Sequence, residues 1–282
     1  MAKPVEGALS SAAATAAPPA EAPPATTVAP TATLPAATKA AGQELTVFAA
    51  ASLTECFGEL GKQFEAAHPG VKVLLNFAGS QQLRAQLEEG AQADVFASAN
   101  AKEMKAAIAS GLVVSGTQKV FARNRLTAIV PAANPGRVSA LADLARPGLK
   151  LVVADKAVPV GQYTLDMLDK MSKDPAFGAD FPERVQANVV SREDNVKSVV
   201  AKVRLGEADA GIVYSTDAGG AAAKDLSLLP IPDEFNQIAT YPLAVLVKAP
   251  QAELGRQFAE FVLSGEGQQT MASFGFIPPE SK

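Results

Sequence analysis

Strands and helices alternate along most of this chain, and this alternation limits the folds that the chain can adopt. The segment Leu45-Thr46-Val47-Phe48 alternates in polarity like a half-buried strand. Three alanines and Ser52 follow it, and the next residues have the spacing of an amphipathic helix, with apolar residues at Leu53, Phe57, Leu60 and Phe64. This order predicts βαβ units and a mainly parallel sheet.

The same order of strand, small residues, serine and helix occurs again. Residues 71–77 are predicted to be a strand, Ala78-Gly79-Ser80 follows, and a helix then presents Leu83 and Leu87 on its apolar face. The alternation continues to the end of the chain. Further strands are expected at residues 94–97, 120–130, 149–153, 185–190, 210–214 and 241–247, and further helices at 101–108, around Leu165 and Leu168, at 195–203 and at 254–262.

Two long β-prone stretches divide this pattern into two α/β lobes. The polar middle of residues 119–131 splits that stretch into two apolar halves, as in a strand that passes between lobes, and residues 241–247 are the expected return crossing. We therefore predict a two-lobed fold with a two-strand hinge, in which the first lobe comprises residues 43–123 and 241–282 and the second comprises residues 124–240. Because ligands bind at the carboxyl ends of strands in open α/β sheets, the facing lobes predict a binding cleft.

Composition excludes several classes of function. The net charge is −4 and no basic cluster is present, so nucleic acid is not an expected partner. The single histidine, His68, excludes a histidine-based triad or zinc site, and the single cysteine, Cys56, has no internal disulfide partner. Residues 1–42 are almost entirely Ala, Pro, Thr and Ser and are expected to form a disordered or extended stalk.

The strand-to-helix junctions carry the candidate binding residues. The first lobe offers the hydroxyls of Ser52 and Ser80, and the second offers the amides at Val160 and Val196 and the hydroxyl of Tyr214. Taken singly, each has an ordinary structural role; Ser52, for example, has Glu55 three residues later and is expected to cap its helix in a capping box. Together they form a set of hydrogen-bond donors without a carboxylate, which suits a fully deprotonated anion.

From Glu44 to about Ile277 the sequence resembles the molybdate-binding proteins that supply ABC-type molybdate importers. The matching stretches occur in the same order and spacing as in that family: Val47 to Thr54, Asn76 to Ser80, Ala93 to Ala99, Val158 to Tyr163, Glu193 to Lys197 and Gly211 to Asp217. The resemblance implies a type II periplasmic-binding-protein fold. It also implies that molybdate or tungstate binds to Ser52, Ser80, the amides at Val160 and Val196, and the Tyr214 hydroxyl.

The resemblance implies a transport role rather than catalysis. We expect no cofactor, no catalytic residue, a monomer, and permease subunits of an ABC importer as partners outside the membrane. The stalk resembles that of lipid-anchored relatives, so a membrane tether is expected, although the anchoring cysteine is absent from this numbering. Some relatives have a run of serines around Ser80, which leaves the register there open by one residue, and Lys156 could add a charge at the rim of the cleft.

Three other functions are compatible with these residues. A binding protein of the same kind could take sulfate or another tetrahedral oxyanion. An enzyme could use Ser52 as a nucleophile, but neither a histidine nor a Ser-x-x-Lys pair adjoins it. A regulatory sensor could bind the anion and then a partner, but no DNA-binding motif supports this role.

Overall fold

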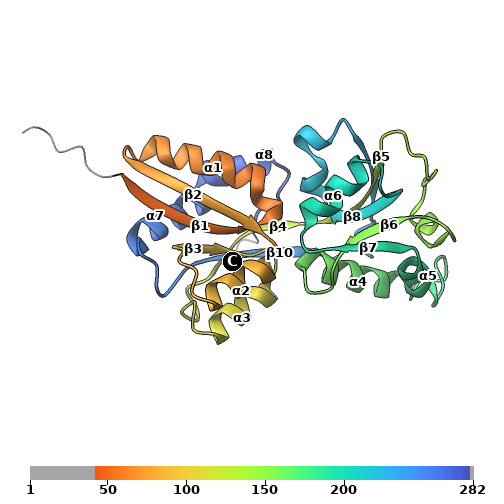
Figure 1. Ribbon diagram of the computed structural model, residues 1–282, viewed down its shortest axis with the longest axis horizontal. Coiled ribbons are helices and arrows are strands. Elements are labelled where there is room, and N and C mark those ends of the chain that lie inside the picture. The colour runs from red at the N-terminus through yellow and green to blue at the C-terminus, as the bar shows by residue number, and fades with distance from the viewer. Residues whose placement is uncertain (1–41, 280–282) are drawn as a thin grey trace, which may run out of the picture. The chain divides into compact units, whose positions relative to one another are not determined.

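Two five-stranded sheets form the framework of the chain in a computed structural model, which describes residues 42–279 (Figure 1). The first sheet has the strand order β2-β1-β3-β10-β4, and its strands are β1 (Gln43–Ala50), β2 (Val71–Ala78), β3 (Val95–Ala97), β4 (Lys119–Asn124) and β10 (Ala239–Val245). The second has the order β7-β6-β8-β5-β9, with strands β5 (Leu126–Pro131), β6 (Leu151–Ala154), β7 (Val189–Glu193), β8 (Ala210–Tyr214) and β9 (Leu226–Pro230).

Helices cover both faces of each sheet, as the alternating pattern predicts. On the first sheet, α1 (Thr54–Ala67), α7 (Ala252–Leu263) and α8 (Gly265–Ser273) pack together on one face, and α2 (Ser80–Glu88) and α3 (Ala101–Ala109) cover the other (Figure 1). On the second sheet, α6 (Val196–Arg204) lies on one face, and α4 (Pro159–Met171) and α5 (Phe181–Ala187) lie on the other. Short 3₁₀ turns occupy Ala51–Leu53, Leu141–Ala145, Ser215–Ala218 and Gly220–Ala222.

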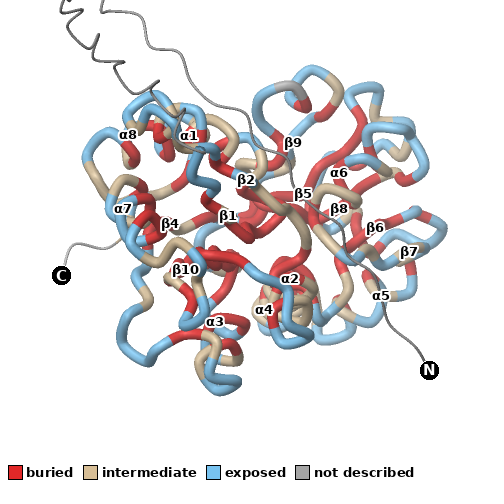
Figure 2. Tube along the Cα trace, turned by 60° about the vertical axis from the view of Figure 1, so that its left-hand side comes forward, coloured by how far each residue is buried: buried red, intermediate tan, exposed pale blue. Residues whose placement is uncertain are grey.

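The parallel strands of each sheet deliver their carboxyl ends to the same edge. In the first sheet, β1 runs parallel to both β2 and β3, and in the second sheet β6 runs parallel to both β7 and β8. The side chains of β3, β6 and β8 and most of those of β1 are buried, so the middle of each sheet is apolar, whereas the outer strands β2 and β7 are mostly part-exposed (Figure 2). The junctions that follow these strands are therefore the places where polar groups can gather.

The chain crosses between the sheets twice. Strand β4 ends at Asn124 in the first sheet and β5 begins at Leu126 in the second, so a single residue separates the two sheets at the first crossing. Strand β10 makes the return and pairs antiparallel with β4. We call the first sheet with its helices the first lobe and the second sheet with its helices the second lobe; the boundaries expected from the sequence, residues 43–123, 124–240 and 241–282, remain a proposal.

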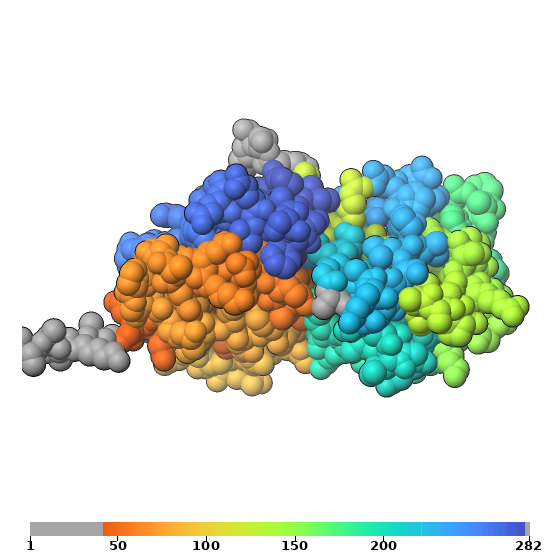
Figure 3. Space-filling view, turned by 90° about the horizontal axis from the view of Figure 1, so that it is seen from above, coloured from red at the N-terminus to blue at the C-terminus, as the bar shows by residue number. Residues whose placement is uncertain are grey.

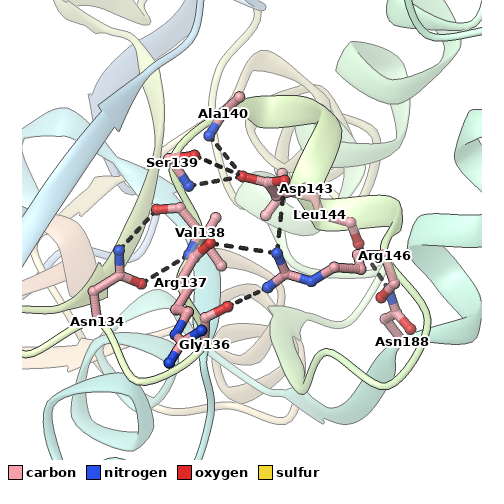
Figure 4. A network of polar contacts seen from close by, with 10 residues as sticks. All are labelled: Asn134, Gly136, Arg137, Val138, Ser139, Ala140, Asp143, Leu144, Arg146 and Asn188. Atoms are coloured by element: carbon pink, nitrogen blue, oxygen red, sulfur yellow. Dashed lines mark hydrogen bonds and ion pairs between the residues drawn. The ribbon is translucent and has the colours of Figure 1, made fainter.

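Polar contacts fix the long connection between β5 and β6 in the second lobe (Figure 4). Asp143 accepts hydrogen bonds from the backbone amides of Ser139 and Ala140, and these bonds, the first of them above all, lower the pKa of its carboxyl group. The Asn188 amide donates to the carbonyls of Leu144 and Arg146. These bonds tie the connection to the end of α5.

Two sequence predictions are wrong at the level of local structure. Ser52 is not a helix cap, because the chain makes a 3₁₀ turn at Ala51–Leu53 before α1 begins, and the Ser52 hydroxyl bonds to Tyr241 instead of a first-turn amide. Residues 185–187 are helical rather than extended, because Phe181 and Val185, four residues apart, form the buried face of α5. Strand β9 and helix α8 were not anticipated.

The stalk expected for residues 1–42 lies outside the described residues, except for Gly42. Within residues 42–279, no helix combines the length and apolar character that a membrane span requires.

Candidate functional site

A small cavity lies where the two lobes meet, and both lobes contribute to its lining. The two lobes are in direct contact across the face seen in Figure 3. The first lobe lines the cavity with Ala50, Ala51, Ser52, Ala78, Gly79, Ser80 and Ala99, and the second lobe lines it with Val158, Pro159, Val160, Asn195, Val196 and Tyr214. All five residues singled out from the sequence, Ser52, Ser80, Val160, Val196 and Tyr214, are in this set.

The cavity suits a ligand of few atoms. Its volume, measured for the centres of water-sized spheres, is about 10 Å³, close to the smallest volume that holds a single water. None of the lining residues carries a formal charge. In this arrangement of the lobes the site leaves no room for a sugar or a peptide.

The Ser80 hydroxyl can donate a hydrogen bond into the cavity, because its oxygen already accepts one from a neighbouring backbone amide. It is the first residue of α2 and is buried. The backbone amide of Ala99, which follows β3, donates to the Ser80 hydroxyl oxygen at 3.0 Å. Since a backbone amide can only donate, the Ser80 hydrogen stays available for a ligand.

Ser52 lies in the 3₁₀ turn that follows β1. Its hydroxyl oxygen is 3.0 Å from the hydroxyl oxygen of Tyr241, and both side chains are buried. Tyr241 lies on β10, 189 residues further along the chain. This contact was not expected from the sequence.

Two helices of the second lobe point their amino-terminal ends at the cavity. Val160 is the second residue of α4 and Val196 is the first residue of α6. The first-turn amides of a helix have no partner within the helix, and the helix dipole places partial positive charge there. The Asn195 side chain caps α6 by accepting from the amide of Ser198, which leaves the Val196 amide to the cavity. Together these ends form an environment that favours an anion.

Tyr214 contributes a buried hydroxyl with an unsatisfied hydrogen-bonding capacity. It is the last residue of β8, and its side chain is 1% exposed. Its hydroxyl forms no hydrogen bond with any residue in the described part of the chain. Burial, together with the nearby Tyr241, raises its pKa well above the ordinary value, so it keeps its proton at neutral pH. A buried hydroxyl without a partner is costly, and a bound acceptor in the cavity would satisfy it.

The other residues noted in the sequence lie away from the cavity. Lys156 is exposed on the turn before α4 and is not among the lining residues. The His68 ring stacks on Phe64 at the end of α1. The Cys56 thiol is buried beside the Met271 sulfur, and burial raises its pKa to about 12, so it is a poor nucleophile.

Charged groups lie close to the site without lining it. The ammonium group of Lys197, on α6, is 3.1 Å from the buried carboxylate of Asp217 and 2.7 Å from that of Glu55 on α1, so this ion pair joins the two lobes. Burial raises the pKa of Asp217 to about 6, although Lys197 opposes the shift. Sequence reasoning missed this cluster, because its three members come from separate segments that only the fold brings together.

A second set of contacts joins the lobes at the edge of the cavity. The side-chain amide of Gln81 donates to the Asp194 carbonyl oxygen at 2.9 Å, and that of Gln82 donates to the Asp194 carboxylate at 3.0 Å. Gly79 lies directly against the same carbonyl, where a β-carbon would come within 2.5 Å of the oxygen. The Gly79-Ser80-Gln81-Gln82 segment therefore both lines the cavity and holds the second lobe against it.

Comparison with known proteins finds similarity along most of the chain. The family of bacterial extracellular solute-binding proteins matches residues 45–277. The chain is 39% identical over 237 residues to the molybdate-binding protein ModA of Mycobacterium tuberculosis, covering 84% of this chain and 85% of that protein.

Solved structures with the same fold include proteins whose titles name a molybdenum transporter and a sulfate-binding protein. The substrate-binding domain of a putative molybdenum ABC transporter from Clostridium difficile is 29% identical, with a TM-score of 0.62 and coverage of 84% of this chain and 99% of that chain. The sulfate-binding protein SubI of Mycobacterium tuberculosis is 20% identical, with a TM-score of 0.75 and coverage of 84% and 88%, and this likeness shows the fold alone.

Proposed function

The chain belongs to the family of bacterial extracellular solute-binding proteins, and we propose that its solute is molybdate or tungstate. The proposed ligands are the hydroxyls of Ser52, Ser80 and Tyr214 and the backbone amides at Val160 and Val196. The bound anion would sit between the lobes and accept hydrogen bonds from both. No separate cofactor is needed, because the anion itself is the cargo.

The observation that carries this proposal is the unpartnered Tyr214 hydroxyl in a cavity lined by donors. The hydroxyl is buried and shares the cavity with two helix amino-terminal ends and with Ser80, whose hydrogen is free to be donated. A fully deprotonated tetrahedral oxyanion supplies acceptors in several directions at once. It would satisfy Tyr214 without placing a proton against another donor, which costs about 1–3 kcal/mol for each unmatched group.

Sulfate is the second candidate, because it is also a deprotonated tetrahedral dianion and a sulfate-binding protein shares the fold. We place it behind molybdate because the 39% identical relative binds molybdate by name. Sulfate is also the smaller ion, and donors spaced for a larger ion cannot all reach it within 2.7–3.2 Å.

We further propose that the protein works outside the cytoplasmic membrane as a monomer and delivers the anion to the permease subunits of an ABC importer. The N-terminal stalk would tether it to the membrane. The family is one of solute-binding proteins, and we extend this to the absence of catalysis: Ser52 is a ligand in this account, with its hydroxyl held by Tyr241 rather than by a general base.

Titration calorimetry tests the proposal. Purified protein, freed of bound anion by partial unfolding and dialysis, is titrated with molybdate, tungstate and sulfate in separate runs. We expect saturable binding of one molybdate or tungstate ion per chain and weaker binding of sulfate. Sulfate binding more tightly than molybdate would support the second candidate, and the lack of binding by all three anions would refute the proposed function.

A further inference from the structure

Ser52 differs from the other proposed ligands because its hydrogen-bonding direction is not fixed by its immediate neighbour. The contact between the hydroxyls of Ser52 and Tyr241 allows either oxygen to donate. If Ser52 donated to Tyr241, it would present lone pairs to the cavity and repel an anion. The orientation of Tyr241 therefore decides whether Ser52 can bind an anion at all.

Asn124 determines the orientation of Tyr241. It is the last residue of β4 and is fully buried. Its side-chain oxygen accepts from the backbone amide of Arg125 at 2.9 Å and from the hydroxyl of Ser215 at 3.1 Å. Because the Arg125 amide can only donate, the oxygen of the Asn124 side chain must face it, and the nitrogen must face the other way.

The amino group of Asn124 donates to two hydroxyl oxygens. One is that of Thr216, at 2.8 Å, and the other is that of Tyr241, at a longer 3.5 Å. With Asn124 donating to it, Tyr241 can direct its single hydrogen to Ser52, at 3.0 Å, rather than to the nearby hydroxyl of Tyr214, with which it forms no hydrogen bond. Burial raises the pKa of Tyr241 well above its ordinary value, so that hydrogen is retained at neutral pH.

We propose that Tyr241 and Asn124 are positioning residues that make Ser52 a hydrogen-bond donor to the bound anion. The order of donation runs from Asn124 to Tyr241, from Tyr241 to Ser52, and from Ser52 to the anion. We call these three residues the hinge relay. The inference rests on the proposed function and adds to it residues that do not line the cavity.

The position of the hinge relay links the donor to the crossing strands. Asn124 ends β4 and Tyr241 lies on β10, and these are the two strands that connect the lobes. Asn124 also contacts Ser215 and Thr216 of the second lobe. Ser80, in contrast, receives its fixed hydrogen bond from the backbone of its own lobe. Of the two serines, only Ser52 is oriented through the hinge.

A double-mutant cycle tests the hinge relay. Tyr241→Phe keeps the ring packing against Phe121, Tyr214 and Phe276, so the variant should fold. We expect it to weaken molybdate binding by about five- to tenfold in the wild-type background, and by less than about twofold when Ser52→Ala is already present. Tyr163→Phe is the matched control. It removes another tyrosine hydroxyl beside Tyr214, outside the relay, and should leave the affinity unchanged.

Asn124→Asp provides a second test of the direction of hydrogen-bond donation between Tyr241 and Ser52. A carboxylate accepts from Tyr241 and draws its hydrogen away from Ser52, so the variant should lose more than tenfold in affinity. In the Tyr241→Phe background the same substitution still adds a negative charge, but it cannot change the hydrogen-bond direction of Ser52. The loss of molybdate affinity should therefore be clearly smaller there.

The outcomes separate the inference from the proposed function. If the wild-type protein binds none of molybdate, tungstate and sulfate, the proposed function and the relay both fail. If the wild-type protein binds but Tyr241→Phe costs the same with and without Ser52→Ala, the relay is wrong and the proposed function stands. An unchanged affinity for Tyr241→Phe would also overturn the relay, and melting temperatures of all variants identify any loss that comes from misfolding.

Discussion

Whether each hydroxyl group in the cavity donates or accepts a hydrogen bond depends on the neighbour that already contacts its oxygen. The amide of Ala99 donates to Ser80, and Tyr241 contacts Ser52. Tyr214 has no partner among residues 42–279. Hydroxyls in general can donate or accept, so a site built from them gains selectivity only when neighbours remove one of the two options.

Tyr214→Phe should weaken molybdate binding by about 1.5–3 kcal/mol, the range for a hydrogen bond to a charged partner. The ring still packs against Tyr241 and Tyr163, so the melting temperature of the anion-free protein should not fall. Calorimetric titration of the variant beside wild type and Tyr163→Phe measures the loss. An affinity equal to that of wild type would show that Tyr214 is a packing residue and not a ligand.

The buried carboxylate of Asp217 predicts a pH dependence of stability. Its neighbours are Lys197, Glu55 and the hydroxyls of Tyr214 and Tyr241. Burial raises its pKa from the ordinary 3.8 to about 6, so the folded chain holds this proton more tightly than the unfolded chain does. The contribution of Asp217 to stability is therefore present at pH 4 and is lost as the pH rises to about 6.

Asp217→Asn should remove this dependence. Relative to wild type, the free energy of unfolding of the variant should rise by about 3 kcal/mol between pH 4 and pH 7, since each pKa unit corresponds to 1.36 kcal/mol. Urea unfolding of both proteins at several pH values gives the difference directly. A difference that is the same at pH 4 and pH 7 would mean that Asp217 titrates normally.

The five cavity residues were selected from the sequence, because each lies at or near a junction between a strand and a helix and the family resemblance implied the same residues. It was not sufficient to find Tyr241, Asn124 or Lys197. Ser52 and Tyr241 are 189 residues apart, and nothing local to either residue indicates the contact. The expected cap at Ser52 was wrong for the same reason, since a distant hydroxyl takes the place of the helix amide.

At the scale of secondary-structure elements, the start of α2 faces the loop before α6 across the boundary between the lobes. Gln81 and Gln82 donate to Asp194, and Gly79 lies against its carbonyl. The backbone of Gly79 has φ −59 and ψ 139, which any residue can adopt. The glycine is therefore required by the close approach of the second lobe and not by the local conformation.

Gly79→Ala should impair closure without harming the fold. Its β-carbon would lie 2.5 Å from the Asp194 oxygen and 2.5 Å from the Gln81 side-chain nitrogen. The flexible Gln81 side chain can move away, but the backbone oxygen can be relieved only if the lobes separate slightly, and overpacking of this kind costs about 1–3 kcal/mol. Molybdate affinity should fall by about five- to 150-fold while the melting temperature of the anion-free protein stays unchanged. Gly58→Ala on α1, where a β-carbon meets nothing within 4 Å, is the matched control.

A Gly79→Ala variant that binds as tightly as wild type would contradict the closed arrangement of the lobes described above. Small-angle scattering of the saturated variant provides an independent check, since incomplete closure predicts a larger radius of gyration than that of saturated wild type.

Elements with clear periodicity were predicted well, and those that depend on the fold were not. Helix α6 was located from the spacing of its four buried valines and from Asn195 at its start. Residues 185–190 were misassigned because a short helix and a short strand meet there. In so short a segment, the spacing of the apolar residues fits either a helix or a strand. Strand β9 is exposed at most of its positions and occupies the edge of its sheet, so it lacks the burial pattern that predicts a strand.

At the scale of the whole folded unit, residues 42–279 show two lobes held together by polar contacts around a small cavity. An anion that contacts donors on both lobes stabilises this arrangement over any open one, so binding shifts the population toward closure. The two-lobed α/β fold itself was predicted from the sequence and is confirmed. The cavity volume could not be predicted, because it depends on how closely the lobes approach.

Anion selectivity tests the central claim, a donor-lined site for a deprotonated tetrahedral oxyanion, most directly. Protein loaded with molybdate is titrated with tungstate, sulfate and phosphate at two pH values near neutrality. Phosphate always carries at least one proton there, and the described lining has no carboxylate to accept it. We predict that tungstate competes effectively, that sulfate competes weakly, and that phosphate is weaker than molybdate by more than tenfold, which requires only about 1.4 kcal/mol. Displacement of molybdate by phosphate at comparable concentration would contradict the account.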